Sequence, residues 1–134
     1  MLLAKPLTFM NVSGRAVQAL MSFYKIAVPD LLIVTDDVNL PLGRLRARPG
    51  GTEGGHNGLR SIAQQLGTVD YARLRIGVGR GDLRRDLADY VLARFEPDEQ
   101  TEIDRATIRA ADAVETWIAD GVNEVMNTFN RAED

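Results

Sequence analysis

The residue types best suited to chemistry gather in one glycine-rich segment, residues 50–58 (Gly-Gly-Thr-Glu-Gly-Gly-His-Asn-Gly). This segment holds five of the chain's 12 glycines and its single histidine, His56. Glycine lets the backbone adopt positive φ and lets a ligand approach closely. A histidine on such a loop can face a cleft, and the amide of Asn57 beside it can donate or accept a hydrogen bond. The segment is therefore a candidate site, with a solvated turn as the alternative.

A helix is expected directly after this loop, with Asn57 as its cap. The apolar residues that recur there at helical spacing are Leu59, Ile62, Ala63 and Leu66. A helix N-terminus favours anionic groups, so a phosphate or carboxylate would suit this position. The loop lacks both the Gly-Lys-Ser/Thr ending of a Walker A sequence and a G-x-G-x-x-G pattern. Those two nucleotide-binding motifs are excluded.

Arginines concentrate in the middle third of the chain, although the net charge is −3. They are Arg44, Arg46, Arg48, Arg60, Arg73, Arg75, Arg80, Arg84 and Arg85. Because electrostatic fields are local at physiological salt, a basic patch can bind phosphate even on an acidic protein. The alternative is a solvated charged face.

The apolar patterns predict an alternation of strands and helices, which favours an α/β layered fold. The expected strands are residues 1–4, a buried run 31–35, an edge strand 44–48 with one wet face, and 71–78, where Arg73 and Arg75 alternate with apolar residues. The expected helices are one capped by Ser13, the one after Asn57, a long one from Pro97 to near Gly121, and a short terminal one from Val122. In α/β sheets, sites lie beyond the carboxyl ends of strands. We therefore expect Asn11, Asp36, Asp37 and the His56 loop to converge.

Composition limits the remaining possibilities. A chain of 134 residues with 45% hydrophobic residues suits one globular domain. The absence of cysteine excludes disulfides and thiolate metal sites, and one histidine leaves little basis for zinc. The apolar start at residues 1–4 stops at Lys5-Pro6, too short for a signal peptide or a spanning helix. We expect a cytoplasmic protein with no membrane partner.

Four stretches resemble motifs of bacterial peptidyl-tRNA hydrolases, in the same order and at compatible spacing. They are residues 5–14 (Lys-Pro-Leu-Thr-Phe-Met-Asn-Val-Ser-Gly), 35–43 (Thr-Asp-Asp-Val-Asn-Leu-Pro-Leu-Gly), 54–59 (Gly-Gly-His-Asn-Gly-Leu) and 73–79 (Arg-Leu-Arg-Ile-Gly-Val-Gly). The resemblance covers essentially the whole chain. It implies a three-layer α/β sandwich, with a mixed sheet flanked by helices, as a single domain over residues 1–134.

The resemblance also implies an activity. Such enzymes, also called aminoacyl-tRNA hydrolases, cleave the ester between a peptidyl (N-blocked aminoacyl) group and the 3′ end of tRNA, which recycles tRNA from stalled translation. They act as monomers on peptidyl-tRNA, without metal or cofactor. By position in the matched motifs, Asp36 would orient and stabilise the family's catalytic histidine. The residues implied in substrate binding are Phe9, Met10, Asn11, His56 and Asn57, and those implied at the tRNA backbone are Arg46, Arg48 and Arg75.

Two family motifs do not occur in this chain: a G-L-G-N-P-G-like loop and the T-R-H-N segment that supplies the catalytic histidine. His56 matches the family's second histidine. The resemblance thus implies a domain incomplete at its N-terminus, with little or no activity in this chain alone.

Taken without the resemblance, His56 and Asp36 could form a base and its orienting carboxylate, with Asn11 or Asn57 as an oxyanion donor. The resemblance assigns Asp36 to a different histidine. Three interpretations stay open: a peptidyl-tRNA hydrolase, a non-catalytic module that binds tRNA or another RNA, and an unrelated hydrolase or nucleotide binder.

Overall fold

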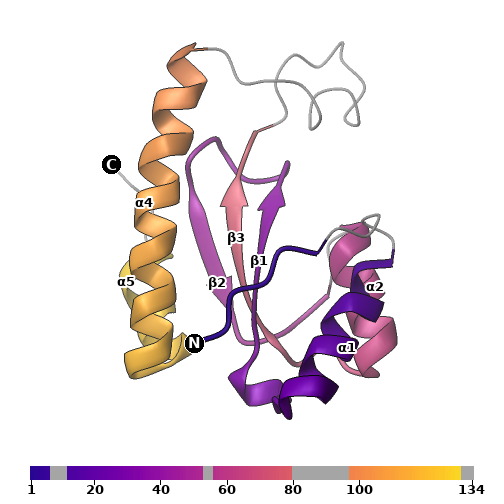
Figure 1. The fold of residues 1–134 in the computed structure, drawn as a ribbon. Coiled ribbons are helices and arrows are strands. Elements are labelled where there is room, and N and C mark those ends of the chain that lie inside the picture. The colour runs from indigo at the N-terminus through magenta and orange to yellow at the C-terminus, as the bar shows by residue number, and fades with distance from the viewer. Residues whose placement is uncertain (7–11, 53–55, 80–96, 131–134) are drawn as a thin grey trace. The chain divides into compact units, whose positions relative to one another are not determined.

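The computed structural model of the chain describes residues 1–6, 12–52, 56–79 and 97–130 (Figure 1). Its elements, in order, are α1 (Ser13–Tyr24), the 3-10 helix η2 (Val28–Asp30), β1 (Leu32–Asp37), β2 (Leu45–Arg48), α2 (Asn57–Leu66), β3 (Ala72–Gly77), α4 (Pro97–Asp120) and α5 (Val122–Phe129). They form two compact units. The first comprises Met1–Leu31 and Gly50–Tyr71, and the second comprises Leu32–Pro49 and Ala72–Asp134.

The first unit is built on the contact between α1 and α2. Gly14 allows this contact, because a Cβ at that position would lie 2.2 Å from the carbonyl oxygen of Ser61. The backbone N–H of Gly14 instead donates to Ser61 Oγ at 2.9 Å. Nearby, the hydroxyl of the buried Tyr71 donates to the carbonyl oxygen of Leu59 at 3.0 Å. The close approach and the hydrogen bond at Gly14 therefore join the two helices, and the Tyr71 bond ties the segment after α2 back to that helix.

Two predictions for the first unit were wrong. Residues 1–4 form no strand and are exposed, because an apolar run forms a strand only where a neighbour pairs with it, and none of the described strands does so. Ser13 is the first residue of α1 and does not cap it: the N-cap position belongs to Val12, which makes no side-chain capping bond. The helix ends at Tyr24, and the φ of 56° at its C-cap, Lys25, lies in the left-handed region.

The second unit contains a mixed sheet of three strands in the order β1-β3-β2. β1 runs parallel to β3, whereas β2 runs antiparallel to it. The expected buried strand at 31–35 is shifted by one residue and extends through Asp36 and Asp37, which end β1 instead of following it. It is also less buried than expected, with Val34 47% exposed, because β1 lies at one edge of this three-stranded sheet.

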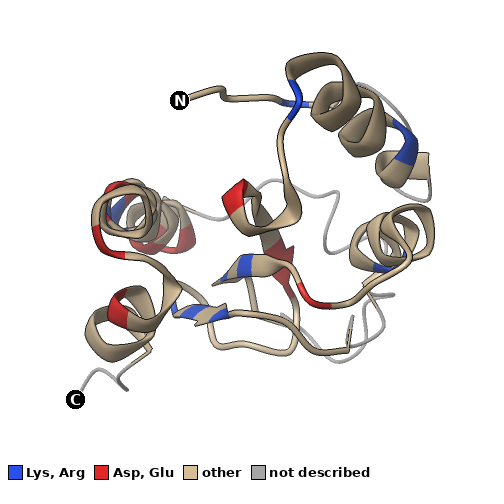
Figure 2. Cartoon of the chain, turned by 90° about the horizontal axis from the view of Figure 1, so that it is seen from below, with Lys and Arg blue, Asp and Glu red and all other residues tan. Residues whose placement is uncertain are grey.

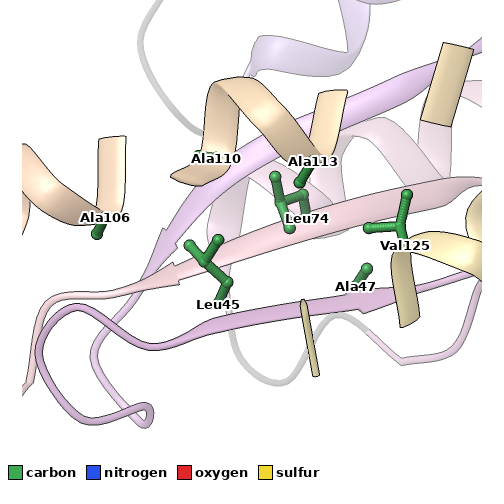
Figure 3. Close-up of a cluster of buried hydrophobic side chains, with 7 residues drawn as sticks. All are labelled: Leu45, Ala47, Leu74, Ala106, Ala110, Ala113 and Val125. Carbon is green, nitrogen blue, oxygen red and sulfur yellow. The ribbon is translucent and has the colours of Figure 1, made fainter. Parts of the chain in front are cut away.

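An apolar core joins one face of this sheet to α4 and α5 (Figure 3). It consists of Leu45, Ala47, Leu74, Ala106, Ala110, Ala113 and Val125. The alanines give α4 a narrow stripe of small side chains, so the core confirms the apolar stripes predicted for the two C-terminal helices. Their predicted bounds near Pro97, Gly121 and Val122 are confirmed as well. Among the described residues, no helix has both the length and the apolar character needed to cross a membrane.

Candidate functional site

The clearest basic feature of the second unit is the arginine ribbon, which we define as Arg46 and Arg48 of β2. Along this strand the side chains alternate between buried and exposed: Leu45 and Ala47 are at most 1% exposed, whereas both arginines face solvent. The predicted edge strand with one wet face is confirmed. Because Leu45 and Ala47 are anchored in the apolar core, the strand presents the two guanidinium groups from a fixed backbone.

Two further arginines of β3 lie on the same face of the sheet as the ribbon. In the antiparallel register, Arg46 lies opposite Arg75 and Arg48 lies opposite Arg73. Directly opposed residues project from the same face, so the two strands concentrate positive charge there. Figure 2 shows basic segments along these strands. Arg73 departs from the predicted basic patch, because it is only 1% exposed and cannot reach a ligand in solvent.

Arg75 is held by Asp37, a residue that the sequence placed near the site but did not pair with this arginine. Its Nη1 lies 3.3 Å from Oδ2 of Asp37, and the side chains are only 19% and 11% exposed. The other oxygen of Asp37 accepts the backbone N–H of Asn39 at 2.8 Å. Like charges placed directly opposite each other destabilise a sheet. Asp37 thus offsets the repulsion between Arg46 and Arg75 and fixes the latter at the end of β3.

Asp36 lies on the opposite face of the sheet from this ion pair. In the parallel register it pairs with Ile76, which packs against the apolar core, and side chains alternate along a strand. The hydroxyl of Thr35 donates to Asp36 Oδ1 at 3.3 Å. The predicted acidic pair at the end of β1 is therefore divided between two faces, with Asp37 toward Arg75 and Asp36 away from it.

A close turn over the end of β3 supports these residues. A Cβ at Gly77 would lie 2.0 Å from the carbonyl oxygen of Pro41, so only glycine fits this position without rearrangement. The N–H of Gly77 donates to Arg44 O at 2.7 Å, and the N–H of Gly43 donates to Gly77 O at 2.9 Å. These bonds anchor the loop that leads into the arginine ribbon.

In the first unit, His56 rather than Asn57 caps α2. The Nδ1 atom of His56 accepts the N–H groups of Gly58 at 3.1 Å and Leu59 at 3.3 Å. Asn57 is the first helical residue and is exposed, so the predicted cap was wrong by one position. An imidazole nitrogen that accepts carries no proton, and the neutral ring then carries its proton on Nε2. The ring presents a donor at Nε2, whereas a general base needs an acceptor there.

The predicted site residues are thus divided among three places. Asp36 and the arginines lie in the second unit, His56 and Asn57 lie in the first, and Phe9, Met10 and Asn11 lie outside the described residues. Their convergence stays a prediction. No group of three or more His, Cys, Asp or Glu side chains suited to a metal ion occurs in the part of the chain that the structure describes.

Solved structures with this fold define the class of protein. The peptidyl-tRNA hydrolase from Acinetobacter baumannii matches with a TM-score of 0.85 and 34% sequence identity, over 96% of this chain and 65% of that one. A structure of a peptidyl-tRNA hydrolase in complex with N-propanol gives the same TM-score and coverage. This confirms the predicted α/β class, with a mixed sheet flanked by helices.

Proteins related in sequence belong to the same class as these solved structures. The peptidyl-tRNA hydrolase of Geobacillus kaustophilus is 46% identical over 128 residues, covering 96% of this chain and 69% of the relative. That of Chloroflexus aurantiacus is 49% identical over 129 residues with the same coverage. The family described as peptidyl-tRNA hydrolase matches residues 1–134. The chain belongs to the peptidyl-tRNA hydrolase family, and it spans about two thirds of the length of these relatives: 69% of the curated proteins and 65% of the solved chains.

Proposed function

We propose that this chain, a member of the enzymes that cleave the ester between a peptidyl group and the 3′ end of tRNA, binds the tRNA backbone through its arginine ribbon. The observation that carries the proposal is the arginine ribbon, in a chain that belongs to this family. Two exposed guanidinium groups project from one edge strand, with Arg75 on the same face. Arginine binds phosphate oxygens in a bidentate manner, so this arrangement suits an RNA backbone.

The remaining site residues have separate roles in this proposal. Asn57 and His56 bind the acceptor end of the substrate, the latter through its Nε2–H, together with Phe9, Met10 and Asn11. Asp36 orients a histidine that takes a proton from the attacking water, as ester hydrolysis requires. Among the 134 residues the only histidine is His56, and its Nδ1 is engaged as a helix cap. This chain alone is therefore expected to hydrolyse its substrate slowly.

The proposal extends to the setting of the protein. The substrate is peptidyl-tRNA, the reaction uses no metal or cofactor, and the protein acts as a cytoplasmic monomer with one domain over residues 1–134. Ester hydrolysis by a base and oriented donors needs no metal in principle, which is consistent with this assignment.

A comparison of arginine variants tests the RNA contact. We expect the double variant Arg46→Ala, Arg48→Ala to bind unacylated tRNA more weakly than the unaltered chain. Its salt dependence should flatten by about one unit of slope per lost phosphate contact. Arg105→Ala is the matched control for the loss of an exposed arginine, since its side chain is 72% exposed on α4 and does not belong to the arginine ribbon. Equal affinity and slope in the double variant would place the RNA elsewhere.

Arg75 needs separate treatment because of its ion pair. Replacing it by alanine removes a proposed phosphate contact and also leaves Asp37 without this partner. We therefore expect the triple variant, with Arg75→Ala added, to flatten the salt dependence further and also to lower stability. A triple variant that binds tRNA as the double variant does would limit the contact to the arginine ribbon.

A second candidate function is a module that binds tRNA without cleaving it. The observation in its favour is the engagement of the single histidine Nδ1 as a helix cap. Both candidates predict tRNA binding, so turnover of a peptidyl-tRNA separates them. Measurable turnover by the 134-residue chain would exclude the second.

A further inference from the structure

Asn130, directly after α5, forms two hydrogen bonds with the backbone of the arginine ribbon strand. Its Oδ1 accepts the N–H of Ala47 at 2.6 Å, and its Nδ2 donates to the carbonyl oxygen of Ala47 at 2.9 Å. The two residues are 83 positions apart in the sequence. A carboxamide has the donor and acceptor of a peptide group, so one side chain takes the place of a neighbouring strand at this edge of the sheet.

This contact matters because of where Ala47 lies. β2 has only four residues, and Ala47 stands between Arg46 and Arg48. An edge strand exposes unpaired backbone groups on the side away from its neighbour. Here Asn130 satisfies both groups of Ala47, whose side chain is fully buried in a core shared with Val125 of α5. The C-terminal segment thus contacts Ala47 in two ways: Val125 shares the core with its side chain, and Asn130 bonds its backbone.

We propose that Asn130 is a positioning residue for RNA binding: it fixes the backbone of β2 so that Arg46 and Arg48 meet neighbouring phosphates together. The inference rests on the proposed function of the arginine ribbon. Holding a binding element in its bound conformation lowers the entropic cost of association. Without Asn130, the edge at Ala47 is free to move, and the two guanidinium groups no longer keep a common geometry.

The first test compares single variants of the full chain with unacylated tRNA as the probe. Asn130→Ala removes both hydrogen bonds, and Asn130→Ser keeps a polar side chain too short to make the pair. We expect about three- to tenfold weaker binding in both, with a flatter salt dependence. Asn123→Ala, which removes an exposed asparagine of α5, is the matched control and should bind as the unaltered chain does. Unchanged affinity in both Asn130 variants would overturn the inference.

A double-mutant cycle separates positioning from a general effect on the fold. In a chain that already carries Arg46→Ala and Arg48→Ala, nothing is left to position, so Asn130→Ala should cost no further affinity. An equal loss in both backgrounds would overturn the inference and leave Asn130 a structural role only. If the arginine variants themselves bind tRNA normally, the proposed function fails and this inference fails with it. Faster amide exchange at Ala47 in the Asn130 variants, without loss of the remaining protected amides, is expected alongside the weaker binding.

Discussion

The two compact units position their polar residues in different ways. In the first, α1 and α2 meet through the close approach at Gly14, and the candidate site residues His56 and Asn57 stand at the start of a helix. In the second, an apolar core holds a mixed sheet, and the arginines stand on an edge strand. Both units bury apolar side chains, among them Val17, Met21, Leu59 and Ile62 in the first. The difference lies in the element that carries the polar residues, which is a helix start in the first unit and an edge strand in the second.

This difference sets what each unit can present to a ligand. A helix N-terminus offers a small number of oriented donors, such as the proposed Nε2–H of His56, which suits recognition of one chemical group. A strand repeats its side chains at regular intervals, which suits the repeated phosphates of an RNA backbone. We therefore expect substitutions in the two units to lower stability by different amounts and for different reasons.

The largest effect is expected in the core of the second unit. Leu74 is fully buried between the sheet and α4, so Leu74→Ala removes its contacts and leaves a cavity. We expect the free energy of unfolding to fall by about 2–5 kcal/mol. Val34→Ala on β1 is the control, since this side chain is 47% exposed and should cost much less. Chemical denaturation measures both, and similar small losses would show that the sheet does not rely on this core.

The next largest losses of stability are expected at two glycines that another segment of backbone approaches closely. Gly14→Ala in the first unit and Gly77→Ala in the second each place a Cβ within 2.2 Å of a backbone oxygen. We expect a loss of about 1–3 kcal/mol in each, as for other overpacked sites. If residues 1–134 form one domain, as proposed, both variants shift a single common unfolding transition. Two transitions, each moved by one variant only, would show instead that the units unfold independently.

A smaller effect is expected at the cap of α2. His56→Ala removes the acceptor of two backbone N–H groups and should cost about 1 kcal/mol, whereas His56→Asn supplies another good cap and should cost less. Because the chain has one histidine, its ring nitrogens can be assigned without ambiguity in a ¹⁵N NMR spectrum. We expect the proton on Nε2. A protonated Nδ1 in the neutral ring would contradict the capping geometry.

Sequence patterns predicted the features that depend on periodicity. The apolar spacing gave α4 and α5 with their bounds, and the alternation in residues 44–48 gave an edge strand with exposed arginines. Motif resemblance gave the family. The expected strand at residues 1–4 was wrong because an apolar run carries no information about whether a partner strand lies beside it.

Contacts between residues far apart in the chain leave no periodic pattern in the sequence. The ion pair of Arg75 with Asp37 joins residues 38 positions apart, and Asn130 reaches Ala47 across 83 positions. Neither pair belongs to a repeating pattern, so only the fold could reveal it. The capping role of His56 was missed for a local reason: asparagine is a common N-cap, and Asn57 stands next to it.

We propose that this chain binds tRNA through its arginine ribbon while its one histidine serves as a helix cap and not as a base. Turnover of an N-blocked aminoacyl-tRNA by the 134-residue chain, measured beside a full-length relative, tests it most directly. We expect tRNA binding with turnover about 10²–10⁴-fold below the relative, the usual contribution of general-base catalysis. His56→Ala should weaken substrate binding through the lost Nε2–H contact but leave the rate at saturating substrate unchanged. Turnover close to that of the relative, abolished by His56→Ala, would contradict the account and make His56 the base.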